Sequence, residues 1–95
     1  MFFVLHAFDK AGALEKRLAN YEAHKAFLAD TSPHGVAIII SGPLVADDGT
    51  SMIGSLMILE ARDRATIEAF NRADPFHAAG IWERVDINAF VKRQG

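Results

Sequence analysis

Apolar residues change their spacing several times along the chain, and each change predicts a new secondary-structure element. Residues 2–8 are rich in aromatic and β-branched side chains, which is typical of a strand. Over residues 13–29 the apolar positions recur at spacings of three, four and seven, which predicts one amphipathic helix. The apolar run at 36–40 predicts a second strand, and we expect Gly42 and Pro43 to end it. The apolar stripe of the helix consists of Leu14, Leu18, Tyr21 and Leu28.

The second half of the chain repeats this alternation of strand and helix. Asp48-Gly49 is a turn dipeptide, so a third strand over residues 51–61 should pair with the second strand as a hairpin. Asp63 is a suitable N-cap for a second helix. The residues of this helix that we expect to face inward are Ile67, Phe70 and Ala73.

A proline ends the second helix and leads to the last strand. Because a residue before proline avoids helical backbone angles, the helix should end at Asp74. Residues 75–79 should add one further turn, which Gly80 closes. Apolar and polar residues then alternate over residues 85–91, which predicts the final strand.

The element order β-α-β-β-α-β predicts an α+β protein of the ferredoxin-like class. Right-handed crossover connections would place both helices on one face of a four-stranded antiparallel sheet. The same rule predicts that the first and third strands are central. The expected strand order is therefore fourth, first, third, second.

Both faces of the two central strands are apolar, although an antiparallel sheet with one face in water should alternate apolar and polar residues. A large uncovered apolar face is typical of a partner surface, so we expect a homodimer joined sheet to sheet. In the first strand, Phe2, Val4 and Phe8 oppose Phe3, Leu5 and Ala7. In the third strand, Met52, Leu56 and Ile58 oppose Ile53, Met57 and Leu59.

Composition narrows the class of protein further. A chain of 95 residues is long enough for one domain, residues 1–95, and too short for two cores. Ten basic and twelve acidic residues give a net charge of -2, which argues against binding to nucleic-acid phosphates or to anionic membranes. The absence of cysteine excludes disulfides and thiolate metal sites. No apolar run approaches the ~20 residues of a membrane span, so we expect a cytoplasmic protein.

Two residues are the main candidates for chemistry. His24 lies in the row Arg17, Tyr21, His24 and Leu28, which at 100° per residue points toward the sheet or its margin. It is either a core-edge histidine with one hydrogen bond or, beside a carboxylate, a general base. Asp74 either caps the turn at Pro75 or orients a histidine, and a carboxylate could do both.

The remaining histidines are weaker candidates. His6 should lie on the face of Phe2 and Val4 as a core, interface or pocket residue. We expect His34, in a Pro-His-Gly turn, and His77 to be exposed to solvent. The histidines are not spaced as the ligands of a metal site usually are, so we expect no metal. The sequence also lacks a glycine-rich phosphate-binding loop, so we expect no nucleotide cofactor.

Several short motifs together make the sequence resemble the YCII-related (YciI-like) family. They are E-K-R-L at 15–18, A-H at 23–24, S-G-P-L at 41–44, I-G-S at 53–55, A-D-P-F at 73–76 and A-G-I-W-E at 79–83. The resemblance implies a dimeric α+β barrel similar to muconolactone isomerase. It also implies that His24 and Asp74 form an active-site pair. One branch of the family resembles a dehydrochlorinase of chlorinated hydroxylated aromatics.

Residues near this pair are expected to bind the substrate. Family members often carry an arginine shortly before the histidine, and Tyr21 stands at that place here. Arg17, four residues earlier, could replace that arginine in binding the substrate. With Ser41, Gly42 and Pro43, these two residues are the candidate substrate-binding set.

The leading hypothesis is an enzyme without cofactor or metal. His24 would move protons on a small oxygenated ring compound in a lyase, isomerase or dehydrochlorinase step, and Asp74 would hold its tautomer. Arg17 or Tyr21 would stabilise a developing oxyanion. The alternatives are a noncatalytic dimer that binds or senses a small molecule, and a purely structural dimer.

Overall fold

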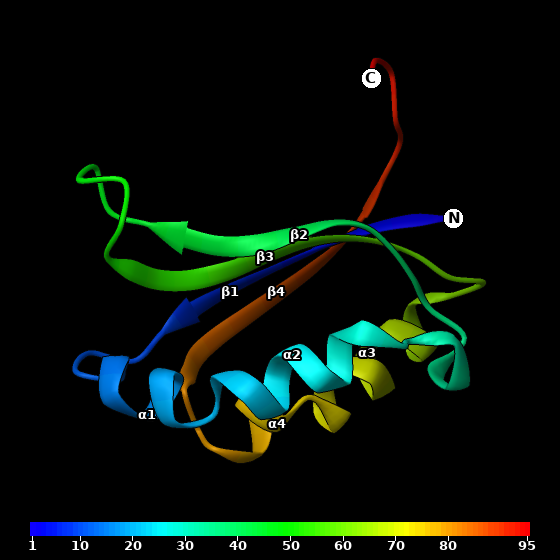
Figure 1. Ribbon diagram of the computed structural model, residues 1–95. Coiled ribbons are helices and arrows are strands. Elements are labelled where there is room, and N and C mark those ends of the chain that lie inside the picture. The colour runs from blue at the N-terminus through cyan, green and yellow to red at the C-terminus, as the bar shows by residue number, and fades with distance from the viewer.

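The strands of the computed structural model, which describes all 95 residues, form a single antiparallel sheet in the order β2-β3-β1-β4. This arrangement confirms the predicted ferredoxin-like α+β fold and its strand order. All the helices pack on one face of the sheet (Figure 1). The strands are β1 (Phe2–Asp9), β2 (Ala37–Val45), β3 (Met52–Glu60) and β4 (Trp82–Phe90).

The first helical segment is interrupted, so the prediction of one helix over residues 13–29 was wrong. Asn20 leaves helical geometry, with φ -106° and ψ 5°. Its backbone N–H still donates to the carbonyl oxygen of Lys16 at 3.0 Å, and its side-chain amide donates to the same oxygen at 2.8 Å, so Asn20 closes the last turn of the first helix. The helical elements are α1 (Leu14–Ala19), α2 (Tyr21–Ala29), the 3₁₀ turn η1 (Ser32–His34), α3 (Arg64–Ala73) and α4 (Pro75–Ala78).

The helix faces also differ from the predicted stripe. Leu14 and Leu18 are 47% and 55% exposed, whereas Arg17 and His24 point inward and are buried. Arg17 and His24 therefore share the inner face of α1 and α2 with Tyr21 and Leu28, the two residues of the predicted stripe that pack against the core. In α3, Ile67 and Phe70 are buried as expected, but Ala73 is exposed, so its expected inward direction was wrong, and Asn71 is the third buried residue of this helix.

Strand β2 does not end at Gly42 and Pro43, as predicted, but continues to Val45. It is an edge strand of the sheet, so a residue without an N–H group can be accommodated there. Pro43 pairs with Ser55 of β3, and a register shift lies between Ile38 and Ile40. This extension of β2 places Ser41, Gly42 and Pro43 opposite the helices, where they line the cavity described below.

The core lies between the sheet and the helices. Thirteen buried apolar residues form it, and they include Phe70 and Phe76 from the helices and Trp82 from the start of β4. Arg17, His24 and Asp74 are buried at its margin. No helix is long and apolar enough to cross a membrane.

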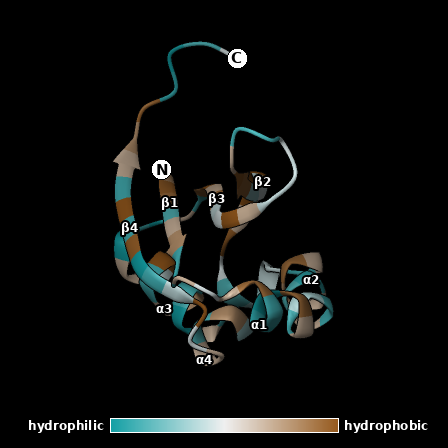
Figure 2. Ribbon diagram, turned by 90° about the vertical axis from the view of Figure 1, so that its left-hand side faces the viewer, coloured by the Kyte–Doolittle hydropathy of each residue, from teal (hydrophilic) through white to brown (hydrophobic).

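The other face of the sheet carries no helix (Figure 1), and its central strands are apolar. Phe2 and Val4 of β1 and Leu56 and Ile58 of β3 are only half-buried there, while Met57 faces the core. We call this surface the open sheet face. Hydrophilic and hydrophobic segments alternate along β4 (Figure 2). Its open-face residues are mostly polar, because Arg84, Asp86 and Asn88 pair with open-face residues of β1, whereas Val85 and Ile87 pack against the core.

Candidate functional site

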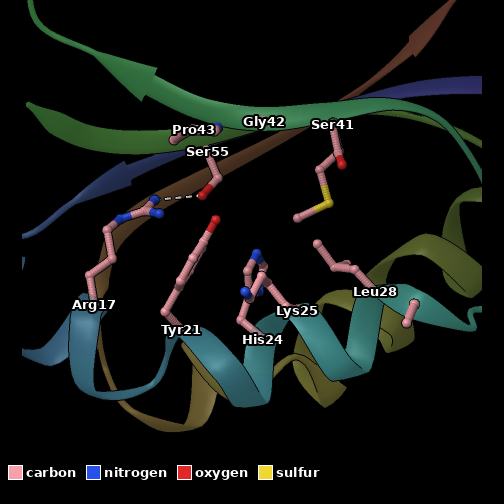
Figure 3. Close-up of a pocket in the computed structure, with 11 residues that line it drawn as sticks. Arg17, Tyr21, His24, Lys25, Leu28, Ser41, Gly42, Pro43 and Ser55 are labelled. Atoms are coloured by element: carbon pink, nitrogen blue, oxygen red, sulfur yellow. Dashed lines mark hydrogen bonds between the residues drawn. The ribbon is translucent and has the colours of Figure 1, made fainter. Parts of the chain in front are cut away.

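A cavity of about 400 Å³ lies between the helices and the strands β2 and β3 (Figure 3). It is lined from the helical side by Arg17, Tyr21, His24, Lys25, Leu28 and Ala29. It is lined from the sheet side by Ser41, Gly42, Pro43, Ser55 and Met57. The cavity therefore brings together all five residues of the expected substrate-binding set with the histidine.

His24 and Asp74, fifty positions apart in the sequence, form a hydrogen-bonded pair. His24 Nδ1 lies 2.8 Å from Asp74 Oδ1, and both side chains are buried. The imidazole also stacks on the ring of Phe76, with 3.9 Å between the ring centroids and 4° between the planes. Because these contacts restrain both the position and the tilt of the imidazole, the side chain is held in one orientation.

Asp74 caps a helix with the same oxygen that binds the histidine. It lies between α3 and α4, and its Oδ1 also accepts a hydrogen bond from the Phe76 backbone N–H at 2.9 Å. Oδ2 is buried and has no hydrogen-bond partner. The cap and the contact with His24, the two contacts that the sequence suggested for Asp74, are therefore both present, and both use Oδ1.

The pair leaves one nitrogen of His24 available to the cavity. An ionised carboxylate only accepts hydrogen bonds, so Nδ1 must carry a proton when it binds Asp74. In the neutral ring Nε2 then has a free lone pair, and this nitrogen points toward the cavity (Figure 3). Such a ring can accept a proton from a bound molecule.

Arg17 lines the cavity, but most of its donors are used inside the protein. Its Nε donates to Asp9 Oδ2 at 2.8 Å, and its Nη2 donates to Ser55 Oγ at 2.6 Å and to the carbonyl oxygen of Gly54. The guanidinium carbon lies 4.9 Å from the centroid of the Phe76 ring. Asp9 therefore balances the charge of Arg17. This ion pair weakens the expectation that Arg17 stabilises a developing oxyanion on the substrate.

The other polar residues at the cavity are less constrained. Tyr21 points its hydroxyl toward the strands (Figure 3). The Lys25 ammonium lies 4.9 Å from the Tyr21 ring centroid and forms an exposed ion pair with Glu22 at 3.1 Å. Lys25 is therefore the cation at the cavity that has no buried carboxylate beside it.

Sequence reasoning missed Asp9, Ser55 and Lys25 as residues of this site. Asp9 is the last residue of β1, and nothing in the sequence around it indicates that it pairs with Arg17, eight positions later. Ser55 lies in the motif I-G-S at 53–55, which supported the family resemblance but assigned no role to this residue. The signal available for Lys25 was its place beside His24 on the same helix.

The remaining histidines lie outside the cavity. His6 is on the open sheet face, with its ring centroid 4.3 Å from that of Phe8. His34 is half-buried against Phe27, at 5.0 Å between centroids, so its expected exposure was wrong. His77 is exposed, as expected. No group of three potential ligands is placed to hold a metal ion.

The comparisons with known proteins agree with this architecture. The family model of the YCII-related domain matches residues 1–91. The chain belongs to the YCII-related family. Protein YciI of Escherichia coli O6:H1 and Protein YciI of Shigella flexneri are each 36% identical to it, over 97% of this chain and 98% of theirs.

Two solved structures extend the comparison of this YCII-related protein. One is 5-chloro-2-hydroxyhydroquinone dehydrochlorinase from Burkholderia phenoliruptrix AC1100, in complex with 2,5-dihydroxybenzoquinone. It is 29% identical, with a TM-score of 0.85 over 96% of this chain and 94% of that chain. A NIPSNAP domain protein from Burkholderia xenovorans, 16% identical with a TM-score of 0.51 over 98% of this chain and 95% of that chain, shares the fold alone.

Proposed function

We propose that this YCII-related protein is an enzyme without cofactor that uses His24 and Asp74 for acid–base chemistry on a small oxygenated ring compound. The observation that supports it most is the buried 2.8 Å contact between His24 Nδ1 and Asp74 Oδ1, with Nε2 directed to the cavity. The similar dehydrochlorinase was solved with a dihydroxylated quinone, which is a ligand of this class.

In the proposed reaction His24 Nε2 removes a proton from a ring carbon or hydroxyl group. The electron pair left behind forms a C=C or C=O double bond and expels chloride from a saturated ring carbon, which in a hydroxylated aromatic exists only in the keto form, with a proton gained at the carbon that bears chlorine. In an isomerisation the electron pair moves a double bond, and the imidazolium returns the proton to another ring carbon. Asp74 stabilises the imidazolium that forms and keeps the ring oriented. A positioned base of this kind contributes about 10²- to 10⁴-fold to a rate.

Negative charge that develops on the ring oxygen needs a positive or donating group nearby. The Tyr21 hydroxyl and the Lys25 ammonium line the same cavity and are not bound to buried partners. We assign the electrostatic role to these two rather than to Arg17, whose charge Asp9 already balances at 2.8 Å.

The proposal includes a homodimer formed through the open sheet face. Its support is the half-buried state of Phe2, Val4, Leu56 and Ile58 on a face that no helix covers. Burial of these side chains against a second copy would remove apolar area from water. The cytoplasmic location expected from the sequence belongs to the same proposal.

The test begins with binding and proceeds to turnover. Purified protein is titrated with 2,5-dihydroxybenzoquinone and then assayed for chloride release from 5-chloro-2-hydroxyhydroquinone and for conversion of related hydroxylated rings and lactones. His24→Ala should abolish turnover while it leaves the circular dichroism spectrum unchanged. His77→Ala is the matched control, because His77 is exposed and lies outside the cavity.

The outcomes separate catalysis from binding alone. Full turnover in His24→Ala would contradict the acid–base role of this residue. Tight binding of the quinone with no turnover of any ring compound would favour the noncatalytic binding or sensing protein instead.

A further inference from the structure

We propose that the Ser55 hydroxyl is the hydrogen-bond donor that recognises an acceptor oxygen on the ring of the substrate. The inference rests on the proposed function, because it takes the cavity as the ligand site, and it assigns a specificity-determining residue within it. Ser55 lines the cavity from β3 and is 3% exposed, so its hydroxyl is shielded from bulk water.

The contact with Arg17 sets the direction of the Ser55 proton. Ser55 Oγ accepts a hydrogen bond from Arg17 Nη2 at 2.6 Å. A guanidinium group has donors only, so the Ser55 proton cannot point toward Arg17. No hydrogen bond of the structure uses this proton, although the hydroxyl is buried. A buried donor without a partner is costly, so a ligand that supplies an acceptor at this place gains affinity.

Arg17 also makes Ser55 a better donor. A hydroxyl that accepts a hydrogen bond from a cation is polarised, which strengthens the bond that it donates. Arg17 is held in place by Asp9 at 2.8 Å and by the carbonyl oxygen of Gly54. The hydroxyl is therefore oriented before a ligand arrives, which lowers the entropic cost of binding.

The position of Ser55 complements that of His24. Ser55 descends from the sheet and His24 rises from α2, so the two side chains approach the cavity from opposite walls (Figure 3). A ring between them can place one oxygen against Ser55 and a proton against His24 Nε2. The recognised class is thus a ring with a carbonyl, phenolate or enolate oxygen, and a ring without an acceptor there should bind more weakly.

The test measures the affinity of 2,5-dihydroxybenzoquinone for the full chain and its variants. Loss of one such hydrogen bond in Ser55→Ala should raise the Kd about tenfold. Ser32→Ala is the control, because it removes an exposed hydroxyl from η1, outside the cavity. The second variant is Ser55→Cys, which nearly keeps the volume but has a weak donor. It should raise the Kd severalfold, and it decides the test if Ser55→Ala does not fold.

An infrared spectrum of the bound quinone provides a readout that a purely structural role of Ser55 would not change. Its carbonyl stretch should shift to lower frequency in the wild-type complex, and the shift should shrink in Ser55→Cys. An unchanged Kd and an unchanged carbonyl band in the Ser55 variants would overturn this inference alone. Absence of quinone binding to the wild type would overturn the proposed function and this inference with it.

Discussion

At the residue scale, the contacts of Asp74 couple the end of a helix to the orientation of an imidazole. Its Oδ1 accepts hydrogen bonds from the Phe76 N–H at 2.9 Å and from His24 Nδ1 at 2.8 Å. The first contact fixes the carboxylate where α4 begins, and the second transmits that position to the ring. Substitutions of Asp74 therefore change helix stability and histidine orientation together, and both must be measured.

The tautomer of His24 is the first prediction. In its neutral form the ring should carry its proton on Nδ1, because an ionised Asp74 accepts a hydrogen bond there. Two-bond ¹H–¹⁵N correlation spectra of the imidazoles distinguish the two tautomers. In Asp74→Ala the preference should be lost, while exposed His77 should be unaffected. A wild-type His24 that is protonated mainly on Nε2 would refute the assignment.

The second prediction concerns Asp48, in the turn between β2 and β3. Hydrogen bonds from the Ser51 side chain and then from the backbone N–H groups of Ser51 and Thr50 lower the pKa of Asp48 from 3.8 to about 2. A lowered folded-state pKa stabilises the protein above the unfolded pKa, and that stabilisation disappears as pH falls from 3.8 toward 2.

Ser51→Ala tests this coupling. The variant should raise the pKa of Asp48 toward its ordinary value, as followed by ¹³C NMR titration of the carboxyl group. The deficit in its free energy of unfolding, measured with urea, should be present at about pH 6 and should narrow at about pH 2. A deficit of equal size at both pH values would show that the carboxylate is not the cause.

At the element scale, Gly54 permits the close approach of β1 and β3 beside the cavity. A methyl group on Gly54 would overlap the backbone oxygen of Ala7 and would lie 3.0 Å from Leu44 Cδ1. The carbonyl oxygen of Gly54 also accepts a hydrogen bond from Arg17. Strand spacing and the position of Arg17 therefore depend on the same residue.

The third prediction compares two glycines on adjacent strands, Gly54 of β3 and Gly42 of β2. Gly54→Ala should lower the free energy of unfolding by about 1–3 kcal/mol, because backbone on the neighbouring strand must move. Gly42→Ala should change it by less than about 0.5 kcal/mol, since its added carbon meets nothing within 4 Å. Urea unfolding measures both values. Equal stability of the two variants would contradict the packing argument.

At the scale of the whole molecule, the fourth prediction is a dimer that depends on the open sheet face. Leu56 lies on this face, whereas Met57 is 1% exposed and faces the core. Leu56→Glu should convert a micromolar dimer to monomer in sedimentation velocity, because a specific interface of ~800 Å² per partner does not tolerate an unpaired buried charge.

The matched control for this variant is Leu18→Glu. Leu18 is also an exposed leucine, 55% accessible, but it lies on α1, on the helical side of the sheet. This variant should remain dimeric. A wild-type protein that sediments as a monomer at micromolar concentration would contradict the proposed dimer directly.

The order of elements, the order of strands and the inward row of Arg17, Tyr21 and His24 could all be determined from the sequence alone. They depend on local periodicity, on turn residues such as Asp48-Gly49 and on the handedness of crossovers, none of which needs distant contacts. The family was recognisable for a similar reason, because its motifs are short and contiguous. The catalytic role of His24 and Asp74 stays a prediction.

Only the tertiary structure decided how these elements meet. Strand β2 continues through Pro43 because it is at the edge of the sheet, and the predicted helix is divided at Asn20, whose backbone leaves helical geometry. Arg17 reaches Ser55 across 38 positions, so the direction of the serine proton depends on strand register and on Asp9. Such contacts are set by the packing of distant segments, and no pattern within a single segment contains them.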